Sequence, residues 1–214
     1  MWILFITSIQ AVVYWNPGYF EKEYTKYQVL DDLPPMTMED LLDVTDEMMD
    51  YLKGDRADLH VVTTMGGETR EFFNDREIAH MEDVRDLFLG AIFLRRVCLV
   101  AAVACLALLF GLKAQIRRVL PPALCLGTGL FFGILAVLAA VRATDFSKYF
   151  VVFHHIFFKN DLWILNPETD MLINIVPEGF FLDTAARIAG LYGALVLVLF
   201  GVSLFLSLRG RGKK

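Results

Sequence analysis

The sequence predicts an α-helical membrane protein, with four transmembrane helices and a small extracytoplasmic β-sheet of two hairpins with an amphipathic helix on top. Two observations predict this class. Hydrophobic residues make up 56% of the 214-residue chain, above their share in soluble domains. They also gather in long segments, and a spanning helix needs roughly 20 apolar residues. The segments lie at about 2–15, 87–112, 120–141 and 185–208.

The first segment is the shortest, and we interpret it as a retained helix rather than a cleaved signal peptide. No basic residue precedes it, and no small-x-small cleavage pattern follows it. Its end is aromatic, which is typical of a membrane interface. The aromatic residues are Tyr14, Trp15, Tyr19 and Phe20.

The basic residues predict the orientation, because cytoplasmic loops of membrane proteins are enriched in Lys and Arg. Both the connection between the second and third segments and the C-terminal end are basic. Both termini are therefore expected in the cytoplasm, and the loops 16–86 and 142–184 outside, within a single membrane domain, 1–214. The basic residues are Lys113, Arg117, Arg118, Arg209, Arg211, Lys213 and Lys214.

The first outer loop predicts three elements. Thr37 is typical of a capped helix start, apolar residues then recur at helical spacing, and Gly54 ends this amphipathic helix. Residues 59–73 contain two β-type runs around Gly66 and Gly67, which predicts a hairpin. A new helix then starts at Asn74 and continues into the second apolar segment.

The second outer loop begins with FHHIFFKND, residues 153–161, in which two histidines stand among aromatic residues. Two apolar runs follow, 162–165 and 171–176, and the Pro- and Asx-containing stretch 166–170 separates them. This pattern predicts a second hairpin. We expect the two hairpins to join in one small sheet, because pairing satisfies their edges.

Several kinds of chemistry lack a sequence signature. Cys98, Cys105 and Cys125 fall inside predicted spans, where they are expected to be inert packing residues. The chain shows no zinc-ligand spacing, dinucleotide fingerprint, phosphate loop or nucleophile elbow, and no basic nucleic-acid patch. We therefore expect no metal, no cofactor and no nucleic-acid partner.

The histidines next to the membrane are the candidates for chemistry. His80 precedes the second span and has Asp83 three residues on, while His154 and His155 lie in the other outer loop with Asn160 close by. Because histidine titrates near neutral pH, these side chains can exchange protons, and the two loops could meet above the helices. Asp161 could also orient a histidine.

The chain resembles the lipoprotein intramolecular transacylase family of Gram-positive bacteria. The resemblance covers nearly the whole chain and depends on three stretches: HMEDV, residues 80–84; FHHIFFKNDLWILNPETDMLI, residues 153–173; and PEGFF, residues 177–181. It implies a multi-pass enzyme of the bacterial cell membrane with its active site on the extracytoplasmic side. The substrate would be a diacylated lipoprotein, whose sn-2 acyl chain moves to the α-amino group of the N-terminal cysteine and leaves a lyso-form lipoprotein.

The resemblance also implies roles for single residues. His154 matches the constant histidine of the family's FH-x-IFF pattern and would remove the amine proton, with His155 in reserve. His80 would protonate the departing glycerol oxygen or stabilise the oxyanion, and the two roles can be interchanged. The remaining candidates would support the histidines or bind substrate and lipid. They are Asp83, Asn160 and Asp161 for support, and Trp163, Phe157, Phe181 and the intramembrane Arg95 for substrate.

Two other functions fit the same residues. The outer sheet could be a non-enzymatic binding or assembly module with pH-responsive histidines. Alternatively, His80, His154 and a carboxylate such as Glu77 or Asp161 could hold a metal for hydrolysis, although no ligand spacing supports this reading.

The first apolar segment is also shorter than the resemblance leads one to expect.

Overall fold

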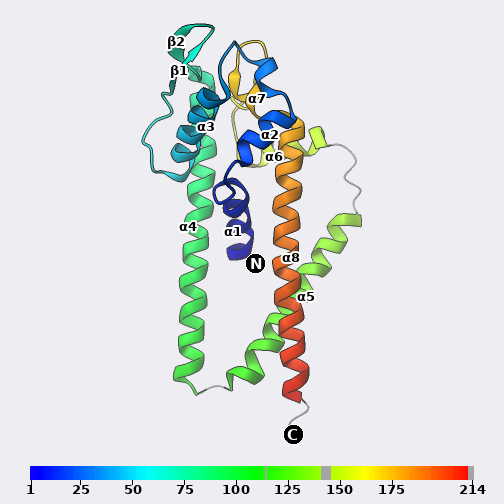
Figure 1. The fold of residues 1–214 in the computed structure, drawn as a ribbon. Coiled ribbons are helices and arrows are strands. Elements are labelled where there is room, and N and C mark those ends of the chain that lie inside the picture. Colours follow the sequence, from blue (N-terminus) through cyan, green and yellow to red (C-terminus); the bar gives the residue numbers. More distant parts are fainter. Residues whose placement is uncertain (114, 141–145, 212–214) are drawn as a thin grey trace. The chain divides into compact units, whose positions relative to one another are not determined.

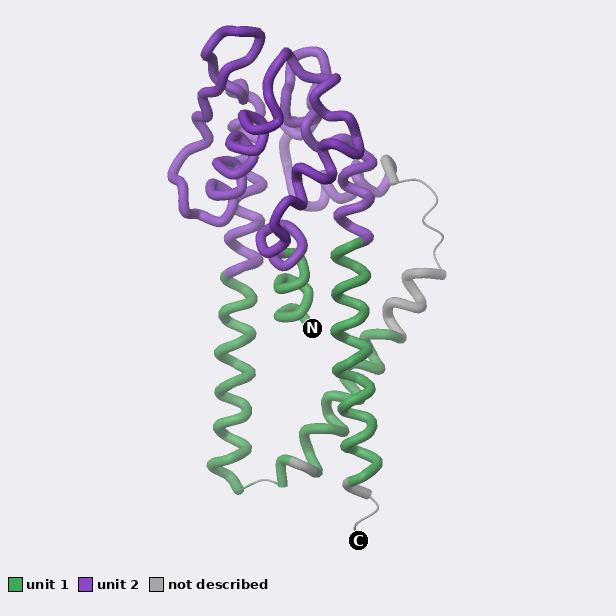
Figure 2. Tube along the Cα trace, in the orientation of Figure 1, with its two compact units in different colours: residues 1–9, 93–144, 187–214 green, residues 10–92, 145–186 purple. Residues whose placement is uncertain are grey.

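The computed structural model describes residues 1–113, 115–140 and 146–211 and is mostly helical, with one small sheet (Figure 1). The chain divides into two compact units: residues 1–9, 93–144 and 187–214 in unit 1, and residues 10–92 and 145–186 in unit 2 (Figure 2). The described elements are α1 (Trp2–Val13), α2 (Tyr19–Lys26), the 3-10 helix η1 (Val29–Asp32), α3 (Met38–Lys53), β1 (Val62–Met65), β2 (Glu68–Glu71), α4 (Asp75–Gly111), α5 (Ile116–Ala140), α6 (Phe146–Phe157), α7 (Met171–Ile175) and α8 (Glu178–Arg211).

Two of the described helices, α4 and α8, are long and apolar enough to cross a membrane. They contain 37 and 34 residues. At 1.5 Å per residue each is more than about 50 Å long, whereas the hydrocarbon core is about 30 Å thick. Each helix therefore has room for a span and for a further part outside it. In α4 the charged part comes first, and the apolar part begins at Leu87.

The count of four spans remains a prediction. Helix α1 has 12 residues, too few to cross a hydrocarbon core of about 30 Å unaided. In α5 the described apolar stretch is also short, Arg118–Phe132. The predicted third span, 120–141, and the predicted loop 142–184 include residues 141–145, which lie outside the described part of the chain.

Aromatic side chains connect the helices of unit 1. The ring of Tyr192 on α8 lies 5.4 Å from that of Phe5 on α1 and 5.4 Å from that of Phe131 on α5, between centroids. Phe132 and Phe200 make a further contact at 6.0 Å. Most other apolar side chains of α4 and α8 face outward. A helix surface of this kind fits lipid rather than water.

The predicted elements of the first loop are confirmed in unit 2. Helix α3 begins with a capping box between Thr37 and Asp40 and ends at Gly54, whose φ is 89°. Strands β1 and β2 pair antiparallel, with Met65 opposite Glu68. The two turn residues, Gly66 and Gly67, have φ values of 62° and 83°, which a two-residue hairpin turn requires and glycine adopts without strain.

The predicted second hairpin is wrong. Residues 162–165 form no strand, and residues 171–175 form the short helix α7. The turn does exist, because the Asp170 side chain accepts a hydrogen bond from the Asn166 backbone, 2.7 Å long. After this turn, however, the Leu172 N–H donates to the carboxylate of Glu77 on α4, at 2.5 Å, rather than to a strand. This tertiary contact outweighs the strand propensity of the apolar run.

The helices α2 and α6 and the 3-10 helix η1 were not predicted. In unit 2, α2 packs through its aromatic residues. The Tyr24 hydroxyl and the Thr45 hydroxyl of α3 form a buried hydrogen bond of 2.8 Å, while Tyr19 and Thr184 of α8 form one of 2.6 Å. The ring of Phe180 stacks on Tyr24, 5.9 Å between centroids. These contacts fix the first turn of α8 within unit 2.

Candidate functional site

His80 lies in the second turn of α4, and the start of this helix is tightly capped. The Asn74 side chain accepts hydrogen bonds from the backbone N–H groups of Arg76 and Glu77, at 2.9 and 3.0 Å. The buried Glu77 carboxylate accepts one from the Asn74 N–H, 2.8 Å long, and completes a capping box. Since Glu77 also binds the Leu172 N–H, the helix start is held to α7. His80 thus occupies a rigid position.

His154 lies on α6, with a phenylalanine four residues before it and another four residues after it. Its Nδ1 lies 2.7 Å from the carbonyl oxygen of Phe150. A carbonyl can only accept a hydrogen bond, so Nδ1 carries the proton. In the neutral imidazole the other ring nitrogen, Nε2, then carries the lone pair. The backbone of α6 therefore fixes His154 in the tautomer of a base that acts through Nε2.

The rings of His80 and His154 face each other, with 6.1 Å between their centroids and 35° between their planes. Both side chains are buried, each residue being 6% exposed. Phe158 contacts both rings, at 5.4 Å from His80 and 5.5 Å from His154. The structure thus brings together the two histidines that the sequence predicts as a catalytic pair.

Burial keeps both histidines neutral. Burial and, to a lesser extent, the neighbouring His154 lower the pKa of His80 to about 4, against the opposing effect of the Asp83 carboxylate. Burial also lowers the pKa of His154, and its bond to the Phe150 carbonyl only partly offsets this. At neutral pH both rings are therefore ready to accept a proton. The Nδ1 atom of His80 is buried and has no hydrogen-bond partner among the described residues.

The indole ring of Trp163 packs against His154. Their ring centroids are 4.7 Å apart and the planes are tilted by 30°. The exposed His155 meets the same indole edge-on at 5.3 Å, so it borders Trp163 rather than the histidine pair. The indole Nε1 of Trp163 is buried and, within the described part of the chain, has no acceptor.

The loop that follows α6 is fastened to α4. The Asn160 side chain donates a hydrogen bond of 2.8 Å to the Asp83 carboxylate and accepts one of 3.1 Å from the Leu162 N–H. About two turns earlier on α4, Arg76 donates to the backbone carbonyl of Asp161. Asp83 and Asn160 thus lie at the contact between this loop and α4, while Asp161 makes its contact through its backbone and its side chain is exposed. The supporting roles of these three residues remain predictions.

The comparisons with known proteins decide the family. The sequence profile described as lipoprotein intramolecular transacylase Lit matches residues 1–181. The chain belongs to the Lit family. It is thus an enzyme, an acyltransferase of lipoprotein maturation, and a membrane-integral protein. No curated protein sequence matches it.

Solved structures of Lit from Bacillus cereus share the fold. One, in meso, has 21% sequence identity and a TM-score of 0.71 and covers 99% of this chain and 92% of that chain. A second, which carries a histidine-to-alanine mutation, has 22% identity and a TM-score of 0.74, covering 99% and 90%. A third carries a histidine-to-arginine mutation, with 22% identity, a TM-score of 0.74 and coverage of 100% and 89%.

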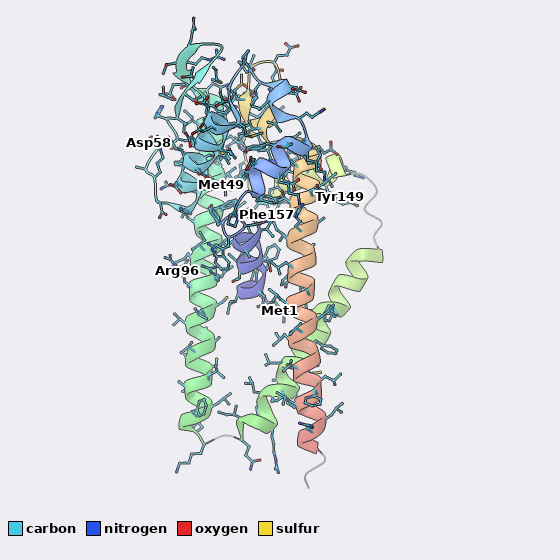
Figure 3. All side chains as sticks on the ribbon, viewed as in Figure 1. Met1, Met49, Asp58, Arg96, Tyr149 and Phe157 are labelled. Carbon is cyan, nitrogen blue, oxygen red and sulfur yellow. The ribbon has the colours of Figure 1, made fainter. Side chains whose placement is uncertain are left out.

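The candidate substrate-binding residues of this Lit-family chain lie at different places. Phe157, labelled in Figure 3, is half exposed and packs on Phe153, 4.7 Å between centroids. Phe181 contacts Phe150, which in turn contacts His154 at 4.1 Å. Arg95 belongs to unit 1, whereas the histidines belong to unit 2. The roles of all three in binding substrate remain predictions.

Sequence reasoning missed three residues that shape this Lit site, Phe150, Phe158 and Arg76, and considered Glu77 only as a carboxylate near His80 or a metal ligand. Phe150 and Phe158 flank His154 at helical spacing, and Glu77 and Arg76 connect α4 to the second outer loop. A signal for Glu77 was present, since Asn74-x-x-Glu77 has the spacing of a capping box. The spacing of Phe150, His154 and Phe158 also fits a helix better than the strand-rich loop that was expected.

No group of three His, Cys, Asp or Glu side chains among the described residues is arranged to hold a metal ion. The two carboxylates proposed for such a site do not lie in a common cluster of ligands among the described residues. Glu77 accepts backbone hydrogen bonds, and the Asp161 side chain is exposed. The geometry of the described residues thus gives a metal-dependent hydrolase no support.

Proposed function

We propose that this enzyme transfers the sn-2 acyl chain of a diacylglyceryl-modified lipoprotein to the α-amino group of its N-terminal cysteine, with His154 as the general base. The observation that carries the proposal is the hydrogen bond from Nδ1 of His154 to the Phe150 carbonyl, because it leaves Nε2 as the basic atom beside the second histidine. The lowered pKa of His154 favours its neutral, basic form at physiological pH.

The reaction conserves all atoms. The amine nitrogen forms a bond to the ester carbonyl carbon, and Nε2 of His154 takes the proton that the nitrogen loses. The bond from this carbon to the glycerol oxygen then breaks, and the proton passes to that oxygen. The products are an amide and a free sn-2 hydroxyl on the same lipoprotein.

The proposed reaction requires no nucleophile from the protein, because the substrate supplies both the amine and the ester. This suits the chain, since Cys98, Cys105 and Cys125 fall inside predicted apolar spans, where a reactive thiolate would be costly. Holding the amine next to its own ester lowers the barrier through proximity. The task of the site is then to move a proton and to stabilise the charge that forms on the carbonyl oxygen.

His80 takes the second role in this proposal. With its pKa near 4, few His80 rings carry a proton at neutral pH, so it is a poor store of an acidic proton. A neutral imidazole still has one N–H that can bind a developing negative charge, as known for other enzymes. His80 therefore stabilises the tetrahedral intermediate or the departing glycerol oxygen as a hydrogen-bond donor.

The proposed topology places the site on the extracytoplasmic side, at the membrane surface, where diacylated lipoproteins and membrane lipids are available. Basic residues support it. Lys113 and Arg118 lie at the connection between α4 and α5, and Arg209 lies near the end of α8, so this side of the helices is proposed to face the cytoplasm. His80 precedes the apolar part of α4 and is thus assigned to the opposite side.

A diacylated lipopeptide with a deuterated sn-2 chain tests the reaction. Incubation with the purified protein is expected to give a product of unchanged mass, with a blocked N-terminus and with the deuterium in the N-terminal acyl fragment. A mixture of labelled and unlabelled lipopeptides should show no exchange of chains. Loss of the acyl mass would indicate hydrolysis, and exchange between peptides would exclude an intramolecular transfer.

A further inference from the structure

We propose that the indole N–H of Trp163 donates a hydrogen bond to the carbonyl oxygen of the reacting ester and so stabilises the oxyanion of the transfer. This inference rests on the proposed function, because it assigns the donor for the charge that this reaction creates. It differs from the role expected from the sequence, in which Trp163 flanks an acyl chain. It makes Trp163 a catalytic residue.

The first argument is the burial of the donor. The Nε1 atom of Trp163 is inaccessible to solvent, and the described residues provide no acceptor for it. An indole N–H can only donate, and nearly all buried donors in native proteins have a partner. Aromatic side chains that serve only as apolar walls do not need a buried N–H, since phenylalanine fills that role. The unsatisfied donor therefore points to an acceptor on the substrate.

The second argument is position. The indole and the His154 ring are 4.7 Å apart between centroids, so a carbonyl that binds Nε1 lies next to the proposed base. His80 contacts the same histidine and has a buried Nδ1 without a partner among the described residues. The two rings that lie beside His154 thus each carry a buried nitrogen without a partner among the described residues. An oxyanion has enough lone pairs to bind two donors, as in the oxyanion holes of acyl-transfer enzymes.

The third argument is rigidity. Trp163 follows the loop segment that α4 fastens through two contacts, from Asn160 to Asp83 and from Arg76 to the Asp161 carbonyl. The Ile164 N–H also donates to the Asp161 carbonyl, at 3.2 Å, which closes a turn around the tryptophan. Once the bound ester has displaced the side chains that cover Nε1, a donor held in this way is already in position when the charge develops, and such preorganisation is the source of its catalytic effect.

The proton of Trp163 stays on the indole throughout. As the amine nitrogen bonds to the carbonyl carbon, the carbonyl oxygen becomes negative, and the hydrogen bond from Nε1 strengthens. When the bond from carbon to the glycerol oxygen breaks, the carbonyl re-forms as an amide and the hydrogen bond weakens again. The tryptophan therefore binds the transition state more strongly than the substrate, which raises kcat.

The test is the Trp163→Phe variant, which keeps an aromatic ring and removes only the indole N–H and part of the area. The kcat for the deuterated lipopeptide is expected to fall by about 100-fold, with KM and the melting temperature near the wild-type values. Trp15→Phe is the matched control, because Trp15 is 62% exposed, and it should keep full activity. An unchanged kcat, or a higher KM at unchanged kcat, would overturn the proposal.

NMR provides a readout that does not depend on the variant's folding. In ¹⁵N-tryptophan-labelled wild-type protein, the Nε1–H signal of Trp163 is expected to move downfield when the lyso-lipopeptide product is added, because the transferred carbonyl now accepts its hydrogen bond. The signals of Trp2 and Trp15 are assigned by their disappearance in the Trp2→Phe and Trp15→Phe variants. In the wild-type protein, these two signals should not shift when the product is added. A Trp163 signal that does not respond to the product would contradict the assignment.

The outcomes separate this proposal from the one on which it depends. If wild-type protein makes no intramolecular product, the proposed function fails. If it makes the product but Trp163→Phe matches its kcat, only the oxyanion assignment fails.

Discussion

The rings of His80 on α4 and His154 on α6 lie next to each other, 6.1 Å apart between centroids and tilted by 35°, although they come from the two predicted outer loops of the chain. Phe158 packs against both rings, and Trp163 covers His154. This arrangement excludes water from two groups that titrate near neutral pH, and burial lowers the pKa of each. The proposed proton transfer depends on this pair of buried, neutral histidines.

The pH dependence of stability should reveal the buried neutral His80. Its pKa in the folded protein is about 4, compared with 6.5 for the free side chain. Between these values the unfolded chain binds more protons than the folded one, so stability is full above about pH 6.5 and is lost as the pH falls toward 4. His154, whose pKa is also lowered, adds to the same effect.

Melting temperatures measured from pH 7.5 down to pH 4 test this loss of stability at low pH. The fall of the melting temperature below pH 6.5 is expected to be smaller in His80→Asn than in the wild type, because asparagine takes up no proton. Histidine ring NMR signals, assigned with the same variant, should show His80 titrating near pH 4. A His80 titration at or above pH 6.5 would be inconsistent with the buried, neutral ring.

The hydrogen bond between Asn160 and Asp83 should couple the loop of Trp163 to α4. We expect Asn160→Ala and Asp83→Ala each to lower kcat, and the double variant to lower it by less than the sum of the two. The coupling energy should be about 1 kcal/mol, a usual value for a partly exposed hydrogen bond. Rates with the lipopeptide substrate measure it, and additive effects of the two changes would show that the contact does not matter.

A control for this cycle comes from an ion pair of the same unit. Lys53 pairs with Asp50 on the exposed side of α3, at 2.8 Å. Such surface pairs contribute little. Lys53→Ala should therefore leave kcat unchanged.

Glu77→Gln should loosen the connection between α4 and α7. The carboxylate accepts hydrogen bonds from the Asn74 and Leu172 N–H groups through different oxygens, and a glutamine has only one oxygen to offer. One buried N–H then faces an NH₂ group, which should lower stability by about 1–3 kcal/mol. Hydrogen exchange of α7 should become faster.

Glu68→Gln is the matched control, because Glu68 is exposed on β2. It should change neither the melting temperature nor the exchange of α7. If Glu77→Gln behaved in the same way, the hydrogen bonds of Glu77 would not be what holds α7.

Gly179→Ala should introduce a clash at the start of α8. A Cβ atom at this position would fall against the ring of Tyr27, with the ring Cζ at 3.0 Å. Overpacking of this kind costs about 1–3 kcal/mol. The melting temperature should fall in Gly179→Ala relative to the wild type. In a chain that already carries Tyr27→Ala, adding Gly179→Ala should cause no such fall.

Gly190→Ala serves as the comparison on the same helix, because nothing lies within 4 Å of its Cβ position. It should be neutral or stabilising, since alanine favours helix more than glycine does. Equal losses in Gly179→Ala and Gly190→Ala would indicate a general effect on α8 rather than the contact with Tyr27.

Residues 37–73 of the first outer loop, unlike α2 and η1 before them, could be predicted from the sequence because local rules decide their structure. The capping box of Thr37 and Asp40 starts α3, and two adjacent glycines form the turn between β1 and β2. These signals act within a few residues. No distant contact opposes them, so the prediction was confirmed.

The second outer loop could not be predicted in the same way. The run 171–176 is apolar and rich in residues that favour strands, yet it becomes helical at α7, where the Leu172 N–H reaches the Glu77 carboxylate. That partner lies far away in the sequence, on α4. Propensity gave the wrong element because a tertiary hydrogen bond decided it.

The candidate site also has some features that the sequence predicts and others that only the structure gives. His80 and the pair His154 and His155 could be chosen from the sequence because each is next to an apolar segment in a predicted outer loop, and the family resemblance favoured His154. The Phe158 contact with both rings, the tautomer of His154 and the buried N–H of Trp163 depend on how α6 packs on α4. Residue type alone does not give them.

The most direct measurement is the initial rate of acyl transfer in His154→Gln compared with His155→Gln. The two residues are neighbours on α6, but only His154 is buried against His80. We expect His154→Gln to lower kcat by about 100- to 10,000-fold, the usual contribution of a general base, and His155→Gln to stay close to the wild type. Full activity in His154→Gln, or an equal loss in both variants, would contradict the account.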